Sequence, residues 1–305
     1  MMKSQPFLSM LGLVLWLVST LPAIAADGPD PRRVSRVLVV YEDASTLPAT
    51  IEIAKGIREG LEARSGTRFE LDTEYLDIVR FPSPDHLRRL GDDLAAKYAD
   101  MHVDVVMAVG HTALQFMLEN RARIAAGAPL IFGSDTEPPK DKPLPADVKG
   151  VLTYFDLRKT IDLARRLQPN AKKAIVLTGS ADYDRLWEKI ARESLGAYPD
   201  LQVEYLSGLT MEGFKEKAKQ LPADVILLIL TVYEDAEGIK LVPHDAAAEI
   251  AAASGAPSYS VYSTFIGTGI LGGYVVTFES MGQDMVRLTD QYLAGAASTP
   301  AFKRE

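Results

Sequence analysis

Residues 103–112 read VDVVMAVGHT, a run of mostly apolar, largely β-branched side chains that ends in Gly110, His111 and Thr112. Its apolar residues do not alternate regularly with polar ones, which is typical of a strand buried on both faces of a parallel sheet. The small and polar residues directly after the run indicate a turn into a helix. This stretch therefore predicts a strand–helix unit, the repeating unit of α/β proteins.

Four other stretches have the same organisation. Each is a short apolar run followed by small, hydroxyl or acidic residues: Val37–Val40 before Tyr41–Ser45, Leu130–Phe132 before Gly133–Asp135, Ala174–Leu177 before Thr178–Asp182, and Val225–Leu230 before Thr231–Asp235. In open parallel sheets, ligands bind beyond the carboxyl ends of the strands. The residues that follow the runs are therefore the expected ligand-binding positions.

A segment with four prolines, Glu137–Gly150, separates two blocks of alternating strand and helix patterns, and its lack of periodicity indicates an exposed connector. We expect an α/β fold with two doubly wound parallel-sheet lobes joined by a hinge. The predicted N-terminal lobe spans residues 34–147, the C-terminal lobe spans 148–265, and residues 266–297 cross back toward the N-terminal lobe. Within that last segment we expect a strand at Tyr274–Phe278 and a helix at Met281–Ala294.

The first 26 residues are typical of a secretory signal peptide. Phe7–Leu21 is an apolar core, and Ala23, Ile24 and Ala25 supply a small-x-small cleavage pattern. A membrane span needs about 20 apolar residues, so an uncleaved anchor is the less favoured alternative. We expect cleavage after Ala25 or Ala26 and a periplasmic or secreted protein.

The 305-residue chain contains no cysteine. This excludes disulfides, thiolate metal sites and a cysteine nucleophile, and it argues against a lipid-anchored protein. The 33 basic and 41 acidic residues give a net charge of −8. Because these charges are interspersed along the chain, a surface for nucleic acid is not expected.

The sequence gives no positive indication of an enzyme. It has no nucleophile elbow, no Walker loop and no zinc-protease signature, and its four histidines have no metal-ligand spacing. Gly267–Gly272 matches the dinucleotide-binding fingerprint, but we expect a strand after it, where the motif requires a helix. A loop between the lobes is the favoured interpretation, and no cofactor or metal is expected.

The expected binding positions combine aromatic rings, carboxylates and small hydroxyl residues. Helix N-termini also offer free backbone N–H groups that favour an anionic group. Aspartate, serine and threonine are ordinary caps at helix starts, which accounts for about half of these residues without any ligand. His111 is open to both interpretations, as an exposed helix-start residue or as a ligand contact.

The order of several segments resembles a known family. These segments are VLVVYEDAS (37–45), DVVMAVGHTALQF (104–116), APLIFGSD (128–135), VKGVLTYFDLRKTIDLARRLQPNAKKAIVLTGSADYDRLW (148–187), GLTMEGFKEKAKQLPADVILLIL (208–230) and GAPSYSVYSTFIGTGILGGYV (255–275). Together they are similar to the ABC-transporter substrate-binding-like family of type I periplasmic binding proteins. The resemblance is strongest to the version that forms the extracytoplasmic sensor region of some bacterial histidine kinases.

The resemblance implies two hinged lobes that close on a small ligand without chemistry. Carried over position by position, it places the ligand contacts in the segments after the strands, whereas ligand identity does not transfer. The individual candidates are Tyr41, Glu42, Asp43, Ser45, Gly110, His111, Thr112, Ser134, Asp135, Ser180, Tyr183, Tyr233, Glu234, Asp235, Tyr262 and Phe265.

The chain ends at Glu305, shortly after its last predicted helix, without a phosphoacceptor or ATPase region. We therefore expect a monomeric, freestanding binding protein of an ABC-type importer, with a small organic ligand that is amino-acid-like or aromatic and an ABC permease as partner. The alternative is a ligand-sensing module that signals to a membrane histidine kinase.

Overall fold

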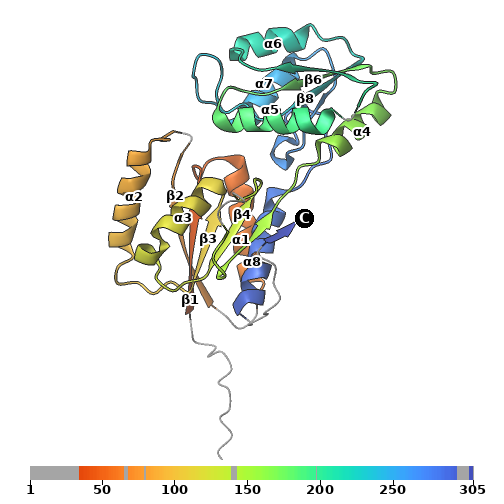
Figure 1. Cartoon of the computed structure of the whole chain (residues 1–305). Helices are drawn as coiled ribbons and strands as arrows, with labels where there is room; N and C mark the ends of the chain where they lie inside the picture. The colour runs from red at the N-terminus through yellow and green to blue at the C-terminus, as the bar shows by residue number, and fades with distance from the viewer. Residues whose placement is uncertain are drawn as a thin grey trace, which may run out of the picture.

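The computed structural model describes residues 34–64, 68–78, 80–138, 143–196 and 198–293, together with the backbone of 302–304. The predicted signal sequence lies outside these residues. Two parallel sheets, each with its own helices, form two lobes (Figure 1). The predicted fold class, an α/β protein of two parallel-sheet lobes, is confirmed.

The N-terminal lobe contains a sheet with strand order β10-β5-β4-β3-β1-β2. Its strands are β1 (Val34–Tyr41), β2 (Arg68–Tyr75), β3 (Val105–Val109), β4 (Leu130–Ser134), β5 (Val148–Leu152) and β10 (Phe302–Arg304). Its helices are α1 (Pro48–Glu62), α2 (Pro84–Lys97), α3 (His111–Ile124) and α8 (Phe278–Leu293).

The C-terminal lobe contains a sheet with strand order β7-β6-β8-β9. Its strands are β6 (Lys173–Leu177), β7 (Gln202–Leu206), β8 (Val225–Ile229) and β9 (Ser258–Tyr259). Its helices are α4 (Leu157–Leu167), α5 (Asp182–Leu195), α6 (Met211–Lys219), α7 (Pro243–Ala253) and the short 3-10 helix η1 (Ser263–Phe265). No helix among the described residues of either lobe combines the length and apolar character that a membrane span requires.

Strand β1 is buried on both faces, as its continuous apolar run predicts. Val37 and Val39 belong to the hydrophobic cluster that contains residues of α1 and α8. Leu38 and Val40, which point to the opposite face, belong to the cluster that contains residues of α2 and α3. The strand ends at Tyr41 between β3 and the edge strand β2, and helices cover both faces of the sheet at this point.

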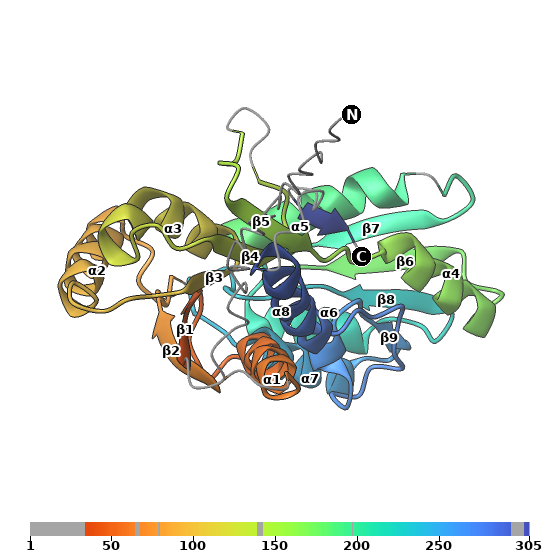
Figure 2. The same cartoon turned by 90° about the horizontal axis from the view of Figure 1, so that it is seen from below.

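Helix α8 joins the N-terminal lobe although it comes from the end of the described chain. It packs against α1, and Figure 2 shows the two helices side by side. A Cβ on Gly56 would lie 2.1 Å from the backbone oxygen of Glu279, and a Cβ on Gly282 would lie 2.3 Å from that of Ile53. Glycine at both positions is what lets the two helix backbones approach so closely.

The expected boundary between residues 147 and 148 is wrong, because β5 pairs with β4 in the first sheet. The chain passes into the second lobe only after Leu152, before α4 begins at Leu157. The proline-rich segment is thus a connection between two strands of one sheet. Composition carries no information about which sheet the next strand joins.

The chain returns from the second lobe between β9 and α8. The strand expected at Tyr274–Phe278 does not form: Val276 makes only an isolated bridge with Tyr262, and α8 already begins at Phe278. Gly273 approaches the second lobe so closely that a Cβ on it would lie 1.7 Å from the backbone oxygen of Ser260. This segment is extended chain held against the lobe rather than a further sheet strand.

Candidate ligand-binding cleft

A cavity of about 640 Å³ lies between the lobes, at the carboxyl ends of the strands. Volumes of about 300–1,000 Å³ are typical of small-molecule sites. Most of the residues predicted from the sequence line it. From the N-terminal lobe these are Tyr41, Glu42, Asp43, Gly110, His111, Thr112, Ser134 and Asp135, and from the other side they are Ser180, Tyr183, Tyr233, Glu234, Tyr262 and Phe265.

Two predicted positions do not line the cavity. Ser45 is exposed in the loop before α1. Asp235 is buried, and its carboxylate accepts hydrogen bonds from the backbone N–H groups of Glu237 (2.9 Å), Ile239 (3.0 Å) and Met211 (3.3 Å). Asp235 therefore holds the turn after β8 in place, the capping role that competes with ligand contact for aspartate in a turn.

Glu42 occupies the N-terminus of α3. Its carboxylate oxygen Oε2 accepts a hydrogen bond of 2.7 Å from the backbone N–H of Thr112. Gly110 makes room for this contact, because a Cβ there would lie 2.1 Å from the Glu42 carboxyl carbon, and its φ of 101° lies in the left-handed region. Burial and the neighbouring Asp43 nevertheless raise the pKa of Glu42 well above its ordinary value, while the helix N–H groups oppose the rise.

Asp43 and Asp135 also line the cavity, and together with Glu42 they form its acidic wall. Burial, with smaller contributions from Asp135 and Asp77, raises the pKa of Asp43 to about 7. Burial also raises the pKa of Asp135, and a hydrogen bond from Tyr183 partly offsets that rise. Among the described residues, no lysine, arginine or histidine forms an ion pair with Asp43, Asp135 or Glu42.

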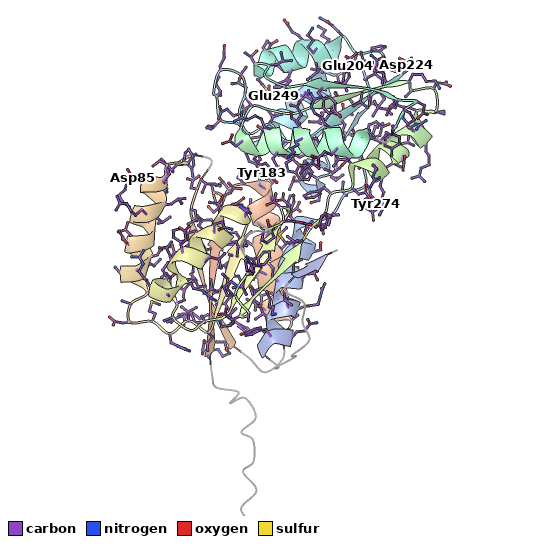
Figure 3. The ribbon with its side chains drawn as sticks, viewed as in Figure 1. Asp85, Tyr183, Glu204, Asp224, Glu249 and Tyr274 are labelled. Carbon is purple, nitrogen blue, oxygen red and sulfur yellow. The ribbon has the colours of Figure 1, made fainter. Side chains whose placement is uncertain are left out.

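A hydrogen bond crosses the cleft. Tyr183, at the start of α5 in the C-terminal lobe, donates its hydroxyl proton to Oδ2 of Asp135, which follows β4 in the N-terminal lobe. Figure 3 shows Tyr183 on the side of the C-terminal lobe that faces the other lobe. The contact ties the two walls of the cavity together directly.

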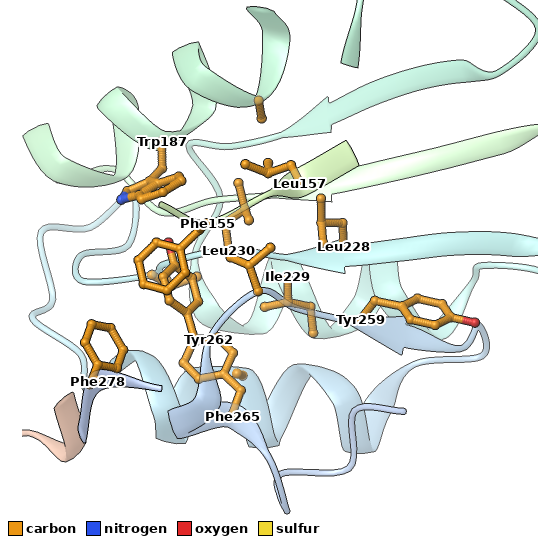
Figure 4. Close-up of a cluster of buried hydrophobic side chains, with 14 of the residues drawn as sticks. Phe155, Leu157, Trp187, Leu228, Ile229, Leu230, Tyr259, Tyr262, Phe265 and Phe278 are labelled. Carbon is orange, nitrogen blue, oxygen red and sulfur yellow. The ribbon is translucent and has the colours of Figure 1, made fainter. Parts of the chain in front are cut away.

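The wall formed by the C-terminal lobe and the returning chain is aromatic. Tyr183 and Tyr233 meet edge to face with ring centroids 5.5 Å apart. The ring centroid of Tyr262 lies 4.8 Å from that of Phe155 and 5.3 Å from that of Phe265, and Figure 4 shows this cluster. Tyr262 is only 3% exposed and lines the cavity, yet its hydroxyl has no hydrogen-bond partner among the described residues.

Asp184 positions the aromatic wall and was not predicted from the sequence. Its fully buried carboxylate accepts hydrogen bonds from the backbone N–H groups of Ala181 (3.0 Å), Tyr233 (3.0 Å) and Glu234 (3.4 Å). Burial raises its pKa to about 6, against the effect of these bonds. In the sequence Asp184 looks like any acidic residue in a first helical turn, so only the position of the neighbouring loop reveals its role.

Other lining residues also carried no sequence signal. Phe278 and Met281 come from the start of α8, and Ile53 comes from α1, so the packed pair of helices forms part of the cavity wall. The glycine-rich stretch Gly267–Gly272 follows η1, does not itself open a helix and does not line the cavity. In the part of the chain that the structure describes, no group of three or more His, Asp or Glu side chains is placed to hold a metal ion.

No family model matches this chain, and no curated protein matches it. Three solved structures are similar to it in fold. An ABC domain in complex with L-Trp from Streptococcus pneumoniae has 16% identity, a TM-score of 0.62 and 90% coverage of each chain. A ligand-free, open substrate-binding protein with adhesive properties from Clostridium difficile has 13% identity and a TM-score of 0.64, over 88% of this chain and 89% of that one.

The third structure is a periplasmic sugar-binding protein of an ABC sugar transporter from Legionella pneumophila. It has 14% identity and a TM-score of 0.57, and the match covers 88% of this chain and 98% of that one. At these identities the likeness establishes the architecture. The chain has the two-lobed fold of type I periplasmic binding proteins.

Proposed function

We propose that this protein is an extracytoplasmic solute-binding protein that holds one small organic molecule between its lobes and delivers it to an ABC-type importer. The observation that carries the proposal is the cavity, which both lobes line with polar and aromatic side chains and which the Tyr183–Asp135 hydrogen bond crosses. The signal-like residues 1–26 support a periplasmic location.

Ligand binding would act by shifting the equilibrium between lobe arrangements. A molecule that touches both walls gains more contacts when the lobes are close together, so it favours the closed form by its difference in affinity for the two forms. The chain connections near Leu152–Leu157 and Tyr259–Phe278 are the segments that would bend. Neither crossing consists of a regular helix or sheet strand over its whole length.

A membrane partner would recognise the closed form through both lobes at once. Large apolar side chains are exposed beside cavity-lining residues on each lobe: Ile51 (54%) and Phe81 (52%) on one, and Leu186 (39%) and Ile239 (52%) on the other. A permease that docks across the cleft would bury these residues only in one lobe arrangement. A membrane sensor kinase that docks on the same rim is the alternative partner.

The test is ligand binding by protein that has been unfolded, washed and refolded to remove any bound molecule. We expect at least one compound of a broad metabolite panel to raise the melting temperature and to give saturable heats in calorimetry. A panel that produces neither signal with correctly refolded protein contradicts the proposed function. Pull-down of solubilised membranes, with and without the ligand, then separates a permease from a kinase.

A further inference from the structure

Two of the helix N-termini that line this cleft are already occupied by the protein's own carboxylates. Glu42 takes the N–H of Thr112 at the start of α3, and Asp184 takes the N–H of Ala181 at the start of α5. Helix N-termini are the usual sites for a ligand carboxylate or phosphate, because their free N–H groups and the helix dipole favour negative charge. The N–H groups of Thr112 and Ala181 are therefore not free to receive an anionic ligand.

The groups that remain in the cavity without a partner of opposite charge are acidic. The lysine and the arginine that line the cavity already have partners there: Lys240 pairs with Glu234, and Arg185 pairs with Asp182 and the backbone oxygen of Ser180. Glu42, Asp43 and Asp135 face the cavity with no cationic partner among the described residues. An uncompensated carboxylate in a partly dry site is costly, and an incoming cation removes that cost.

An independent observation also indicates a missing ligand group. The buried hydroxyl of Tyr262 and the Oγ of Ser180 line the same cavity without a hydrogen-bond partner among the described residues. A hydroxyl oxygen can accept a hydrogen bond from an ammonium group. The rings of Tyr183, Tyr233 and Tyr262 add negatively polarised faces, which attract organic cations.

We propose, on the basis of the solute-binding function above, that the cavity is selective for an organic cation: a protonated amine on an apolar or aromatic body, without a carboxylate. The acidic wall of Glu42, Asp43 and Asp135 takes the ammonium group, and the aromatic wall takes the body. An inorganic metal ion is not the occupant that fits, since the described acidic side chains do not converge as a metal-binding group.

Matched triplets of probes test this selectivity. Each triplet carries one apolar group as an amine, as the corresponding amino acid and as the acid without the amino group: phenethylamine, phenylalanine and 3-phenylpropionate, and likewise 3-methylbutylamine, leucine and 4-methylpentanoate. Calorimetry at pH 8 with ligand-depleted protein should show the amine of at least one triplet binding about tenfold or more tightly than its amino acid, with no binding of the acid.

The outcomes separate this inference from the proposed function. If an amino acid, an acid or an uncharged sugar binds and every amine probe fails, the cation selectivity is wrong while the solute-binding function stands. If neither the triplets nor any compound of the metabolite panel binds, both the cation selectivity and the solute-binding function are contradicted.

Variants then test the acidic wall itself. Asp135→Asn and Glu42→Gln keep the side-chain shape, and each should weaken amine binding by about 10- to 100-fold with an unchanged circular-dichroism spectrum. The matched control is Asp224→Asn, an exposed position before β8, which should bind as the parent protein does. Equal amine affinity in Asp135→Asn, Glu42→Gln and the control would overturn the assignment.

Discussion

Replacing Asp43 by asparagine should change how the stability of the ligand-free protein depends on pH. Asp43 lies among other acidic groups: Glu42 beside it, Asp77 after β2 and Asp135 after β4. Burial, with smaller contributions from Asp135 and Asp77, raises its pKa from 3.8 to about 7. Between these two values the folded protein holds a proton that the unfolded chain has released, so stability falls as pH rises through this window.

The magnitude follows from the size of the shift. A rise of about 3 pKa units corresponds to about 4 kcal/mol at about 1.36 kcal/mol per unit. Water in the cavity and relaxation of the coupled acidic groups reduce this figure, so we expect about 2–4 kcal/mol. The parent protein should therefore lose about 2–4 kcal/mol more stability between pH 4 and pH 8 than Asp43→Asn loses. At pH 8 the variant should be the more stable of the two.

The assay is urea unfolding of ligand-depleted protein at half-unit steps from pH 4 to pH 8, for the parent, Asp43→Asn and the exposed control Asp224→Asn. The control curve should run parallel to the parent curve. Parallel curves for Asp43→Asn as well, or a parent protein whose stability increases steadily across this range, would refute the account of an uncompensated acidic wall.

Three further substitutions test the geometry of the cleft. Gly110→Ala should lower the free energy of unfolding by about 2–4 kcal/mol in urea, because the new Cβ strains the backbone and displaces Glu42. The control is Gly127→Ala, which has a φ of 79° and no atom within 4 Å of the added Cβ, so it reports the backbone cost alone. Equal losses of stability in the two variants would contradict the clash with Glu42. Asp184→Ala should cost about 3 kcal/mol or more, since buried N–H groups lose their acceptor; a loss no larger than that of the exposed Asp182→Ala would contradict this role. Tyr183→Phe removes the hydrogen bond to Asp135 that links the lobes. It should weaken ligand binding about tenfold in calorimetry and change the melting temperature of the ligand-free protein little. Unchanged affinity would show that this hydrogen bond does not support closure.

The sequence predicted the architecture well because its signals are local. Continuous apolar runs such as Val105–Val109 need burial on both faces, and the residues directly after them must emerge at one edge of the sheet. This is why residues as distant as Glu42, Asp135 and Tyr233 could be placed together in one cavity from their positions after strands.

The errors concern long-range partners, which local patterns do not encode. The sheet that Val148–Leu152 joins depends on pairing with β4, not on the prolines before the strand. The roles of Asp184 and Asp235 depend on which backbone N–H groups lie within reach, and both carboxylates turn out to hold loops. The contribution of α8 to the cavity follows from its close packing against α1, which is not visible before the two helices are brought together.

The central claim is that a small ligand binds between the lobes and brings them together, and lobe distance in solution tests it most directly. Because the chain has no cysteine, the double variant Asp85→Cys and Glu249→Cys accepts one fluorophore on exposed α2 of the N-terminal lobe and another on exposed α7 of the C-terminal lobe. We predict that energy transfer between the labels changes saturably with ligand, at the same midpoint as the calorimetric titration. Ligand binding that leaves the transfer efficiency constant would contradict closure of the cleft on its ligand.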